Sequence, residues 1–323
     1  MKALRKPSSR LADASSFFIP TPMVSALHRR IEEWTQCGHT GGLILGEARQ
    51  GKTTAIRALS NGLVNRDNQT IPLFRLHFGR RDVISIRAVF SKIARSLGYL
   101  VRRHQTSDEL QEQISMRLAE AALVNDDRKV VLIVDEAQML AIQQFDAFSE
   151  IYNQLFDLRI NFIVYFVANQ DLFLPVAQAL LGNEYKYLRE RFFNNLTYYY
   201  GIREEAELRE CLTGYDQYPV TDEGDMTATA FFCPSLYDQG WRMANLAPHY
   251  WKQYRNRYGI PLGQKAFSMN QFVRCTNLLL MDFLPMCDSP DNTPMIEACI
   301  IKSLEAGGIE PALAELCKGS RNG

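Results

Sequence analysis

The sequence has no pair of closely spaced cysteines. Its seven cysteines are spread along 323 residues without a CxxC motif, whereas zinc sites and disulfide frameworks use cysteines at short, regular spacing. Internal repeats and low-complexity tracts are absent as well. The 46% hydrophobic and 22% charged content is typical of a globular protein in water. We therefore expect a fold held together by hydrophobic cores.

The chain also lacks a charge excess and a long apolar run. Thirty-six basic residues balance thirty-six acidic ones, so no global field favours nucleic acid or membranes, and DNA binding would need a local patch. No run of about eighteen apolar residues occurs, and the start, MKALRKPSSR, has no apolar core of a signal peptide. We expect a cytoplasmic protein with no membrane partner.

Short apolar runs alternate with segments of helical periodicity up to about residue 202. The strand-like runs lie at 43–45, 72–78, 130–134, 162–167 and 197–200. The segments between them repeat their apolar residues at helical spacing, and a capping box from Thr106 to Glu109 marks one helix start. This alternation predicts an α/β fold with a five-stranded parallel sheet covered by helices on both faces.

The two ends of the chain differ from this middle part. Residues 1–20 look like a flexible arm, and Thr21-Pro22 then starts a helix that stops at Gly38. Beyond residue 202 the strand signals end. Helices are expected there at 204–212, 239–258, 268–285 and 293–306. We predict three segments: an arm and helix at 1–37, an α/β domain at 38–202, and a helical lid domain with a tail at 203–323.

Residues 46–53 read GEARQGKT, which fits the phosphate-binding pattern GxxxxGK[ST]. The pattern stands between a strand and a helix, where loop N–H groups and the helix N-terminus converge on phosphate oxygens. Lys52 would contact the β- and γ-phosphates of ATP, and the Thr53 hydroxyl would bind Mg²⁺. The predicted nucleotide-binding residues of this loop are Gly46, Glu47, Ala48, Arg49, Gln50, Gly51, Lys52, Thr53 and Thr54.

A second buried strand ends in two acids. The run VVLIV is apolar on both faces, as in a central parallel strand, and Asp135-Glu136 follow it. Asp135 would orient the magnesium ion, and Glu136 would act as general base toward the attacking water. Asn169 ends the next apolar run, FIVYFVAN, and is a candidate for positioning that water. A loop asparagine that stabilises a turn is the alternative.

Three arginines are candidates for contact with the nucleotide. Arg191 is the first candidate and Arg189 the second. Both precede the fifth strand and are placed to reach the γ-phosphate on a neighbouring subunit, where an arginine accelerates hydrolysis. Arg242 lies in the predicted lid domain, from which an arginine side chain could reach across to the nucleotide. The alternatives are helix-end cations for the pair and a surface arginine for Arg242.

Taken in order, these motifs resemble an AAA+ ATPase over about residues 17–260. GEARQGKT and DEAQ further resemble the TnsC/TniB regulators of DNA transposition. The resemblance implies an ATPase that binds ATP and Mg²⁺ and assembles on double-stranded DNA without sequence preference. It also implies rings or helical filaments of about six or seven subunits per ring or turn, which link a target-selection protein to the transposase. Ala48 and Arg49 replace the usual Pro-Gly, and arginine adopts positive φ less readily than glycine.

If the resemblance holds, DNA would contact a basic stretch around the second strand and the helix after it. Residues 75–103 carry eight basic residues and one acid. Sequence-independent binding would use such residues on phosphates. The DNA-binding candidates are Arg80, Arg81, Arg87, Arg95 and Arg103. A solvated helix face is the alternative.

Two other functions remain open. A remodelling motor of the ExeA type would use an aromatic or hydrophobic pore loop, whereas the segment after the second strand reads Gly79-Arg80-Arg81-Asp82. An assembly scaffold would bind ATP with little turnover, which Arg49 favours and Glu136 opposes. We predict the regulator, in which ATP hydrolysis dismantles the assembly.

Overall fold

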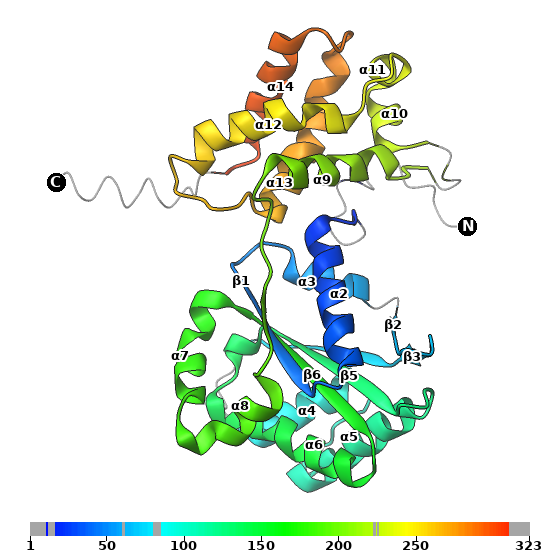
Figure 1. Cartoon of the computed structure of the whole chain (residues 1–323), viewed down its shortest axis with the longest axis vertical. Coiled ribbons are helices and arrows are strands. Elements are labelled where there is room, and N and C mark those ends of the chain that lie inside the picture. Colours follow the sequence, from blue (N-terminus) through cyan, green and yellow to red (C-terminus); the bar gives the residue numbers. More distant parts are fainter. Residues whose placement is uncertain are drawn as a thin grey trace, which may run out of the picture. The chain divides into compact units, whose positions relative to one another are not determined.

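The structure is a computed structural model that describes residues 11, 17–59, 62–79, 85–221, 224 and 226–309. The chain forms two compact units, drawn in sequence colours in Figure 1. The sheet unit comprises Ala26–Ala48 and Lys52–Tyr199, and the helical unit comprises Met1–Ser25, Arg49–Gly51 and Tyr200–Gly323. The predicted domain limits at 37/38 and 202/203 stay predictions.

The sheet unit is built on five parallel strands in the order β4-β5-β6-β1-β7. The strands are β1 (Gly41–Gly46), β4 (Leu73–His77), β5 (Lys129–Asp135), β6 (Asn161–Asn169) and β7 (Leu196–Tyr198). The predicted α/β P-loop fold with a five-stranded parallel sheet is thereby confirmed. The sequence does not signal a short antiparallel ribbon, β2 (Leu63–Val64) with β3 (Thr70–Ile71).

Helices lie on both faces of this sheet, because successive strand residues point to opposite faces. The helices of this part of the chain are α2 (Pro22–Gln36), α3 (Lys52–Ala58), α4 (Ile86–Ser96), α5 (Ser107–Ala122), α6 (Asp146–Asp157), α7 (Gln170–Leu180) and α8 (Lys186–Phe192). On one face, Leu132, Val164 and Phe166 share a buried core with apolar residues of α4 to α8.

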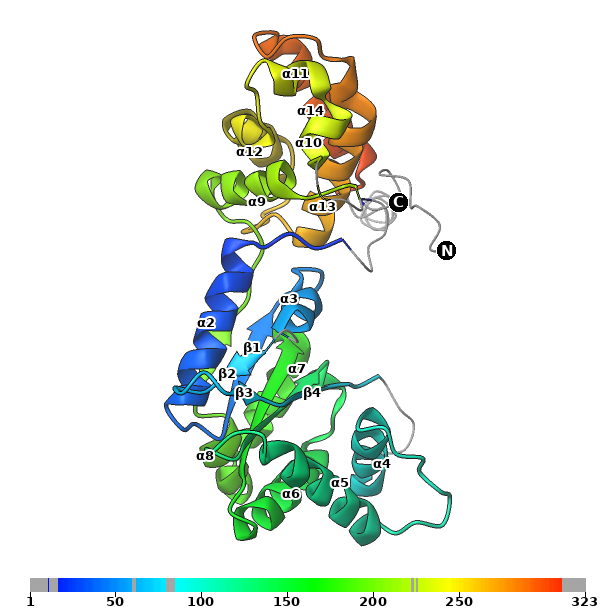
Figure 2. The ribbon, with the colours of Figure 1, turned by 90° about the vertical axis from the view of Figure 1, so that its right-hand side faces the viewer.

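The other face is covered by α2, and Figure 2 shows α2 and α4 on opposite sides of the strands. The rings of Trp34 and Tyr165 lie 5.9 Å apart. The Tyr165 hydroxyl is 2.8 Å from Oγ1 of Thr35, so this buried tyrosine keeps a hydrogen-bond partner. Burial raises the pKa of the Tyr165 hydroxyl.

Local signals at helix starts agree with the sequence. Val24 N–H donates to Thr21 Oγ1 at the start of α2, and Gly38, with φ 78°, follows its end. The capping box of Thr106 and Glu109 opens α5. These ends form as predicted because the capping groups lie within a few residues of the N–H groups they satisfy.

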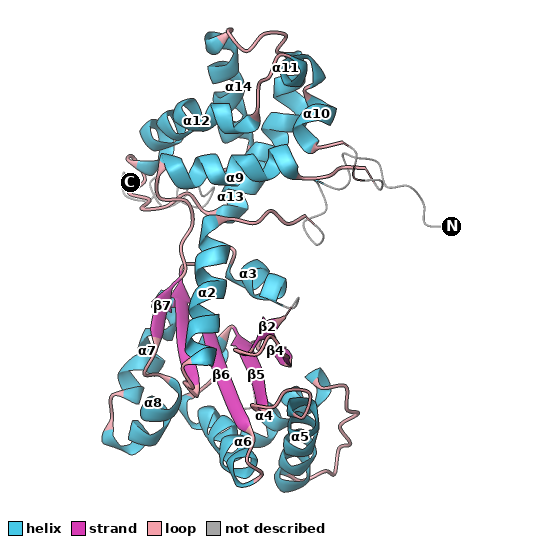
Figure 3. Cartoon of the chain, turned by 45° about the vertical axis from the view of Figure 1, so that its right-hand side comes forward, coloured by secondary structure: helices cyan, strands magenta, loops and turns pink. Residues whose placement is uncertain are grey.

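The helical unit contains, in the described part, helices joined by turns and loops, as Figure 3 shows by colour. Its helices are α9 (Glu205–Gln217), α10 (Ala228–Phe232), α11 (Pro234–Asp238), α12 (Ala247–Tyr254), α13 (Met269–Leu278) and α14 (Thr293–Ala306). The helix predicted at 239–258 is wrong at its start, because Gly240 takes φ 82° and Arg242 is extended. The helix predicted at 268–285 is present as one continuous helical run, in which α13 changes to π-helical geometry at Leu279–Phe283.

Aromatic side chains fill the core of the helical unit. Tyr250, Tyr254 and Phe267 are buried, and the rings of Tyr254 and Phe267 stack with centroids 4.0 Å apart. These aromatic residues therefore serve packing within the helical unit. Among the described helices, none combines the length and apolar character needed to cross a membrane.

Gly41 begins strand β1 at a point with no room for a side chain. A Cβ at Gly41 would lie 2.7 Å from the Val164 carbonyl oxygen and 2.9 Å from Cα of Phe192. We expect Gly41→Ala to lower the free energy of unfolding by roughly 1–3 kcal/mol, because neighbouring backbone must shift. Denaturant unfolding followed by circular dichroism measures the loss.

Gly79→Ala is the matched control. A Cβ at Gly79 meets no atom of the described residues within 4 Å, so we expect a change within about 0.5 kcal/mol. Equal losses in the two variants would contradict the close packing at Gly41.

Candidate nucleotide-binding site

The GEARQGKT loop joins the carboxyl end of β1 to the start of α3. Gly46 has no room for a side chain, since a Cβ there would lie 2.2 Å from the carbonyl oxygen of Tyr199. Gly51 takes φ 98° and Arg49 takes φ 62°. Arg49 thus occupies the left-handed conformation that the sequence flagged as costly for a residue with a side chain. The turn of the loop is made without the usual glycine at this position.

Lys52 is the first residue of α3, and its side chain turns back to the loop. Its Nζ donates to the carbonyl oxygens of Gly46 and Glu47, each at 2.6 Å. Lys52 is 9% exposed. Burial lowers its pKa, while the carboxylates of Glu136, Asp135 and Glu47 oppose that shift. An ammonium so placed beside loop carbonyls is suited to contact an anionic ligand in the same loop.

The side chains of Thr53 and Asp135 meet at the carboxyl edge of the sheet. The Thr53 hydroxyl donates to Oδ2 of Asp135 at 2.8 Å, and Asp135 is 7% exposed. A hydroxyl and a carboxylate are oxygen donors of the kind that Mg²⁺ prefers, and Mg²⁺ commonly takes only one or two protein ligands beside phosphate and water. The pair fits the predicted magnesium site. Among described residues, no cluster of three or more His, Cys, Asp and Glu side chains offers another metal site.

His77 also lies beside Asp135. It ends β4 in register with Asp135 on β5, and its Nδ1 is 3.7 Å from the Asp135 carboxylate. His77 is not among the site residues predicted from the sequence. The signal that would have found it is its place at the end of the strand next to the acidic one, because parallel strands end along one edge.

Glu136 follows β5 in an unusual conformation. It has φ 59° and ψ 40°, and Oδ1 of Asp135 accepts its N–H at 3.0 Å. Its carboxylate accepts a hydrogen bond from Gln138 Nε2 at 2.5 Å. Sequence reasoning missed Gln138, although it is the fourth residue of DEAQ. The acidic residue predicted as base therefore stands at the carboxyl edge of the sheet, held by a neighbouring amide.

Asn169 ends β6 opposite Gly46 in the register of β1 and β6. Its side-chain oxygen accepts the N–H groups of Asp171 and Leu172, both at 3.1 Å. Asn169 thus caps α7, which is the turn-stabilising alternative raised by the sequence. Its position at the edge that carries Glu136 also suits the predicted contact with water, which stays a prediction.

Arg189 and Arg191 make contacts inside the sheet unit. The Arg191 guanidinium donates to Oγ of Ser149 at 2.6 Å and lies 4.4 Å from the Tyr152 ring centroid. Arg189 donates to the carbonyl oxygen of Leu180 at 2.9 Å. Both side chains help to hold α8, and their role toward a neighbouring subunit stays a prediction.

Arg242 makes its contacts within one turn of the helical unit. It donates to the carbonyl oxygens of Tyr237 and Trp241 at 3.0 and 2.7 Å, and its guanidinium lies 3.6 Å from the Tyr237 ring centroid. The structure thus gives Arg242 a local packing role. The contact of Arg242 with the nucleotide stays a prediction.

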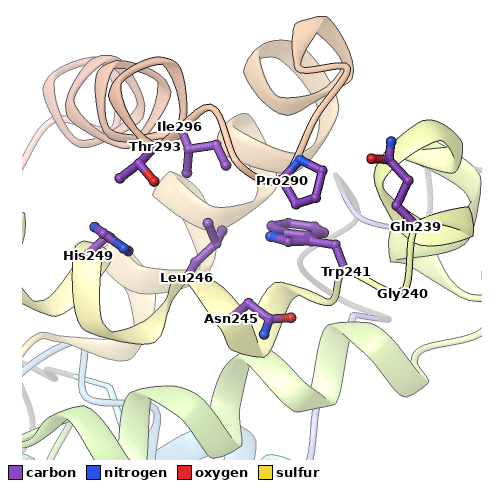
Figure 4. A pocket seen from close by; sticks show the side chains of 9 residues that line it. All are labelled: Gln239, Gly240, Trp241, Asn245, Leu246, His249, Pro290, Thr293 and Ile296. Atoms are coloured by element: carbon purple, nitrogen blue, oxygen red, sulfur yellow. The ribbon is translucent and has the colours of Figure 1, made fainter.

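A hollow of about 290 Å³ lies beside this turn, shown in Figure 4. In this view Pro290 lies next to Trp241, and His249 lies nearer to Thr293 on the other side of Leu246. The lining residues are Gln239, Gly240, Trp241, Asn245, Leu246, His249, Pro290, Thr293 and Ile296. All belong to the helical unit, and none is a predicted nucleotide-binding residue.

The basic candidates for DNA are described only in part. Arg80 and Arg81 lie outside the described residues. Arg95 and Arg103 are exposed. Arg87 is half-buried, and its guanidinium donates to the carbonyl oxygens of Gln105 and Arg103 at 2.9 and 3.0 Å. Arg87 therefore holds the loop after α4, which makes it the least available of the three to a phosphate.

Residues 37–173 match the family model described as "AAA domain". This segment is therefore similar to an AAA domain. Such a domain implies nucleoside triphosphatase activity. The matched segment includes the phosphate-binding loop, the acidic pair and Asn169, and it ends before Arg189 and Arg191. The matching model describes an AAA domain in general and does not identify the TnsC/TniB family. No curated protein matches the chain.

Solved structures similar to the chain include three archaeal proteins. Cdc6p of Pyrobaculum aerophilum shares 17% identity over 86% of this chain and 72% of its own, with a TM-score of 0.43. The ORC2 protein of Aeropyrum pernix shares 15% over 87% and 74%, with a TM-score of 0.41. A Walker-type ATPase of Pyrococcus abyssi shares 11% over 90% of each chain, also with 0.41.

Lys52 offers a direct test of the nucleotide site. We expect Lys52→Ala to weaken ATP binding at least about tenfold, because a hydrogen bond to a charged group contributes roughly 1.5–3 kcal/mol. Equilibrium titration with a fluorescent ATP analogue and Mg²⁺ measures the change. Lys186→Ala is the control, since Lys186 pairs with Glu190 on an exposed helix surface and should leave affinity unchanged. Unaltered affinity in Lys52→Ala would rule out the site.

Proposed function

We propose that this chain is an ATPase whose triphosphate-bound state assembles on duplex DNA, and that it acts as a TnsC-type regulator of transposition. The observation that carries the ATPase part is the meeting of Thr53 and Asp135 at 2.8 Å, with Lys52 and Glu136 beside them. These four side chains supply a phosphate contact, two oxygen ligands and a base at one edge of the sheet.

Each side chain has a distinct task in hydrolysis. Lys52 and the loop N–H groups bind the phosphates, and Thr53 and Asp135 would hold Mg²⁺. When bound, Mg²⁺ neutralises charge that develops on the transferred phosphoryl group. The Glu136 carboxylate accepts a proton from the attacking water, whose oxygen forms the new bond to the γ-phosphorus as the bond to the β-phosphate oxygen breaks. A neighbouring subunit's Arg191, or its Arg189, would stabilise the same charge.

The DNA part rests on two lines of support. The motifs GEARQGKT and DEAQ resemble those of TnsC/TniB regulators, and exposed arginines such as Arg95 lie on or near α4. Backbone contacts by arginine carry no sequence information, so binding would be independent of sequence. In this proposal ATP favours rings or filaments on DNA, which join a target-selection protein to a transposase, and hydrolysis releases them.

Glu136→Gln separates assembly from hydrolysis. The variant keeps a polar side chain of similar size but has no carboxylate to accept the proton. We expect it to bind ATP, to lose at least about a hundredfold in turnover, and to persist as rings or filaments on duplex DNA. Electron microscopy with ATP, with a non-hydrolysable analogue and without nucleotide reads out assembly, and phosphate release reads out turnover.

The wild-type chain is the control in the same experiment. It should form assemblies on DNA with the analogue, lose them as ATP is consumed, and form none without nucleotide. If no particles bind DNA in any of the three conditions, the proposed DNA binding is contradicted, and the chain would be an ATPase that acts on another partner. Assemblies that form equally with and without nucleotide would contradict the proposed control of assembly by ATP.

Arg95 and Arg103 test the basic stretch. We expect Arg95→Ala with Arg103→Ala to weaken duplex binding and to reduce the slope of log affinity against log salt by about two, roughly one for each lost phosphate contact. Fluorescence anisotropy at several salt concentrations measures both. Arg117→Ala is the control, because Arg117 is exposed on α5 and pairs with Glu120. An unchanged slope in the double variant would exclude this surface.

A further inference from the structure

Gln138 joins two parts of the AAA domain through both ends of one side-chain amide. Its Nε2 donates to Oε2 of Glu136 at 2.5 Å. Its Oε1 accepts the backbone N–H of Asn169 at 3.0 Å. The amide therefore lies between the predicted base after β5 and the last residue of β6.

The orientation of this amide is fixed by its two partners. A carboxylate only accepts hydrogen bonds, and a backbone N–H only donates. If the amide were turned over, its NH₂ would face the Asn169 N–H and its oxygen would face the Glu136 carboxylate, and both contacts would become repulsive. The Asn169 N–H thus determines that Gln138 presents a donor to Glu136.

The Asn169 end of this link is firmly held. Asn169 lies opposite Gly46 in the register of β6 and β1, and its side-chain oxygen caps α7 through Asp171 and Leu172. A donor on the main chain at the end of a buried central strand moves little. Gln138 therefore takes its position from the rigid sheet.

The Glu136 end needs such support. The backbone of Glu136 is held in the left-handed region by Asp135 Oδ1 and by Met139, whose N–H donates to the Glu136 carbonyl oxygen at 2.9 Å. These contacts fix the direction of the Cα–Cβ bond of Glu136. They do not fix the side-chain torsion angles of Glu136. The hydrogen bond from Gln138 fixes the carboxylate itself.

We propose that Gln138 is a positioning residue for ATP hydrolysis. It orients the Glu136 carboxylate toward the water that attacks the γ-phosphate, and it ties that orientation to the end of β6 and the start of α7. The inference rests on the ATPase function proposed above. Gln138 itself takes up no proton and contacts no ligand in this mechanism.

Gln138→Leu tests the proposal, since leucine has similar bulk and no hydrogen-bonding group. We expect kcat for ATP to fall about tenfold or more, as is usual when a hydrogen-bonded partner of a reacting group is removed. The affinity for ATP should be unchanged, because Gln138 lies outside the phosphate-binding loop. Gln143→Leu is the control, an exposed glutamine a few residues further along, and should keep wild-type kcat and affinity.

A double variant shows whether Gln138 acts through Glu136. In the Glu136→Gln background, Gln138→Leu should cause no further loss of turnover, because the group that it positions is already gone. Thermal unfolding checks that each variant folds. If Gln138→Leu does not fold, Gln138→Asn takes its place, since it keeps the amide but is one methylene too short to bridge both partners.

The outcomes separate the two proposals. Absence of turnover in the wild type and in Gln143→Leu would refute the ATPase function. With both active, wild-type kcat in a folded Gln138 variant would refute the positioning role alone. A further loss in the Glu136→Gln background, or a loss of ATP affinity equal to the loss of kcat, would equally refute it.

Discussion

The hydrogen bond from Thr53 to Asp135 joins the start of α3, which follows the phosphate-binding loop, to the end of strand β5. The two residues are 82 positions apart, and β6 lies between their strands in the sheet. They meet because parallel strands end along one edge and because α3 starts directly after the loop that leaves β1. Register, strand order and loop length must all agree for this contact to form. A shift of one residue in β5 would send Asp135 to the opposite face of the sheet.

Burial of the strands concentrates the chemistry at that edge. The interior of β5 from Val130 to Val134 is fully buried, so charged groups are excluded until the strand ends at Asp135. Asn169 likewise ends the buried strand β6, and His77 ends the neighbouring strand β4. Polar groups from three neighbouring strands thus gather where the sheet meets solvent. Gln138 then links two of these ends, which makes the edge one connected network.

Four of the candidate arginines, Arg87, Arg189, Arg191 and Arg242, have local hydrogen-bond partners. Arg191 binds Ser149, Arg242 binds Tyr237 and Trp241, and Arg87 binds Gln105 and Arg103. A half-buried guanidinium needs acceptors for its donors, and backbone carbonyls satisfy them. Contact with a phosphate in trans would exchange these bonds for stronger charged ones.

By itself, the sequence determined the features that depend on neighbours along the chain. The GEARQGKT loop, the capping box at Thr106 and the strand–helix alternation follow from local chemistry and period, and they predicted the α/β fold and the loop residues. The helix predicted at 239–258 is wrong at its start, because Gly240 takes left-handed backbone and Arg242 takes extended backbone.

Only the tertiary structure decided which distant side chains meet. Nothing in the spacing of Gln138, Glu136 and Asn169 says that one amide bridges the other two, since that contact requires β5 and β6 to be adjacent in register. The same holds for His77 beside Asp135 and for Arg191 beside Ser149. Local sequence sets the conformations available to each segment, and the pairing of strands sets which of their ends come within hydrogen-bonding distance.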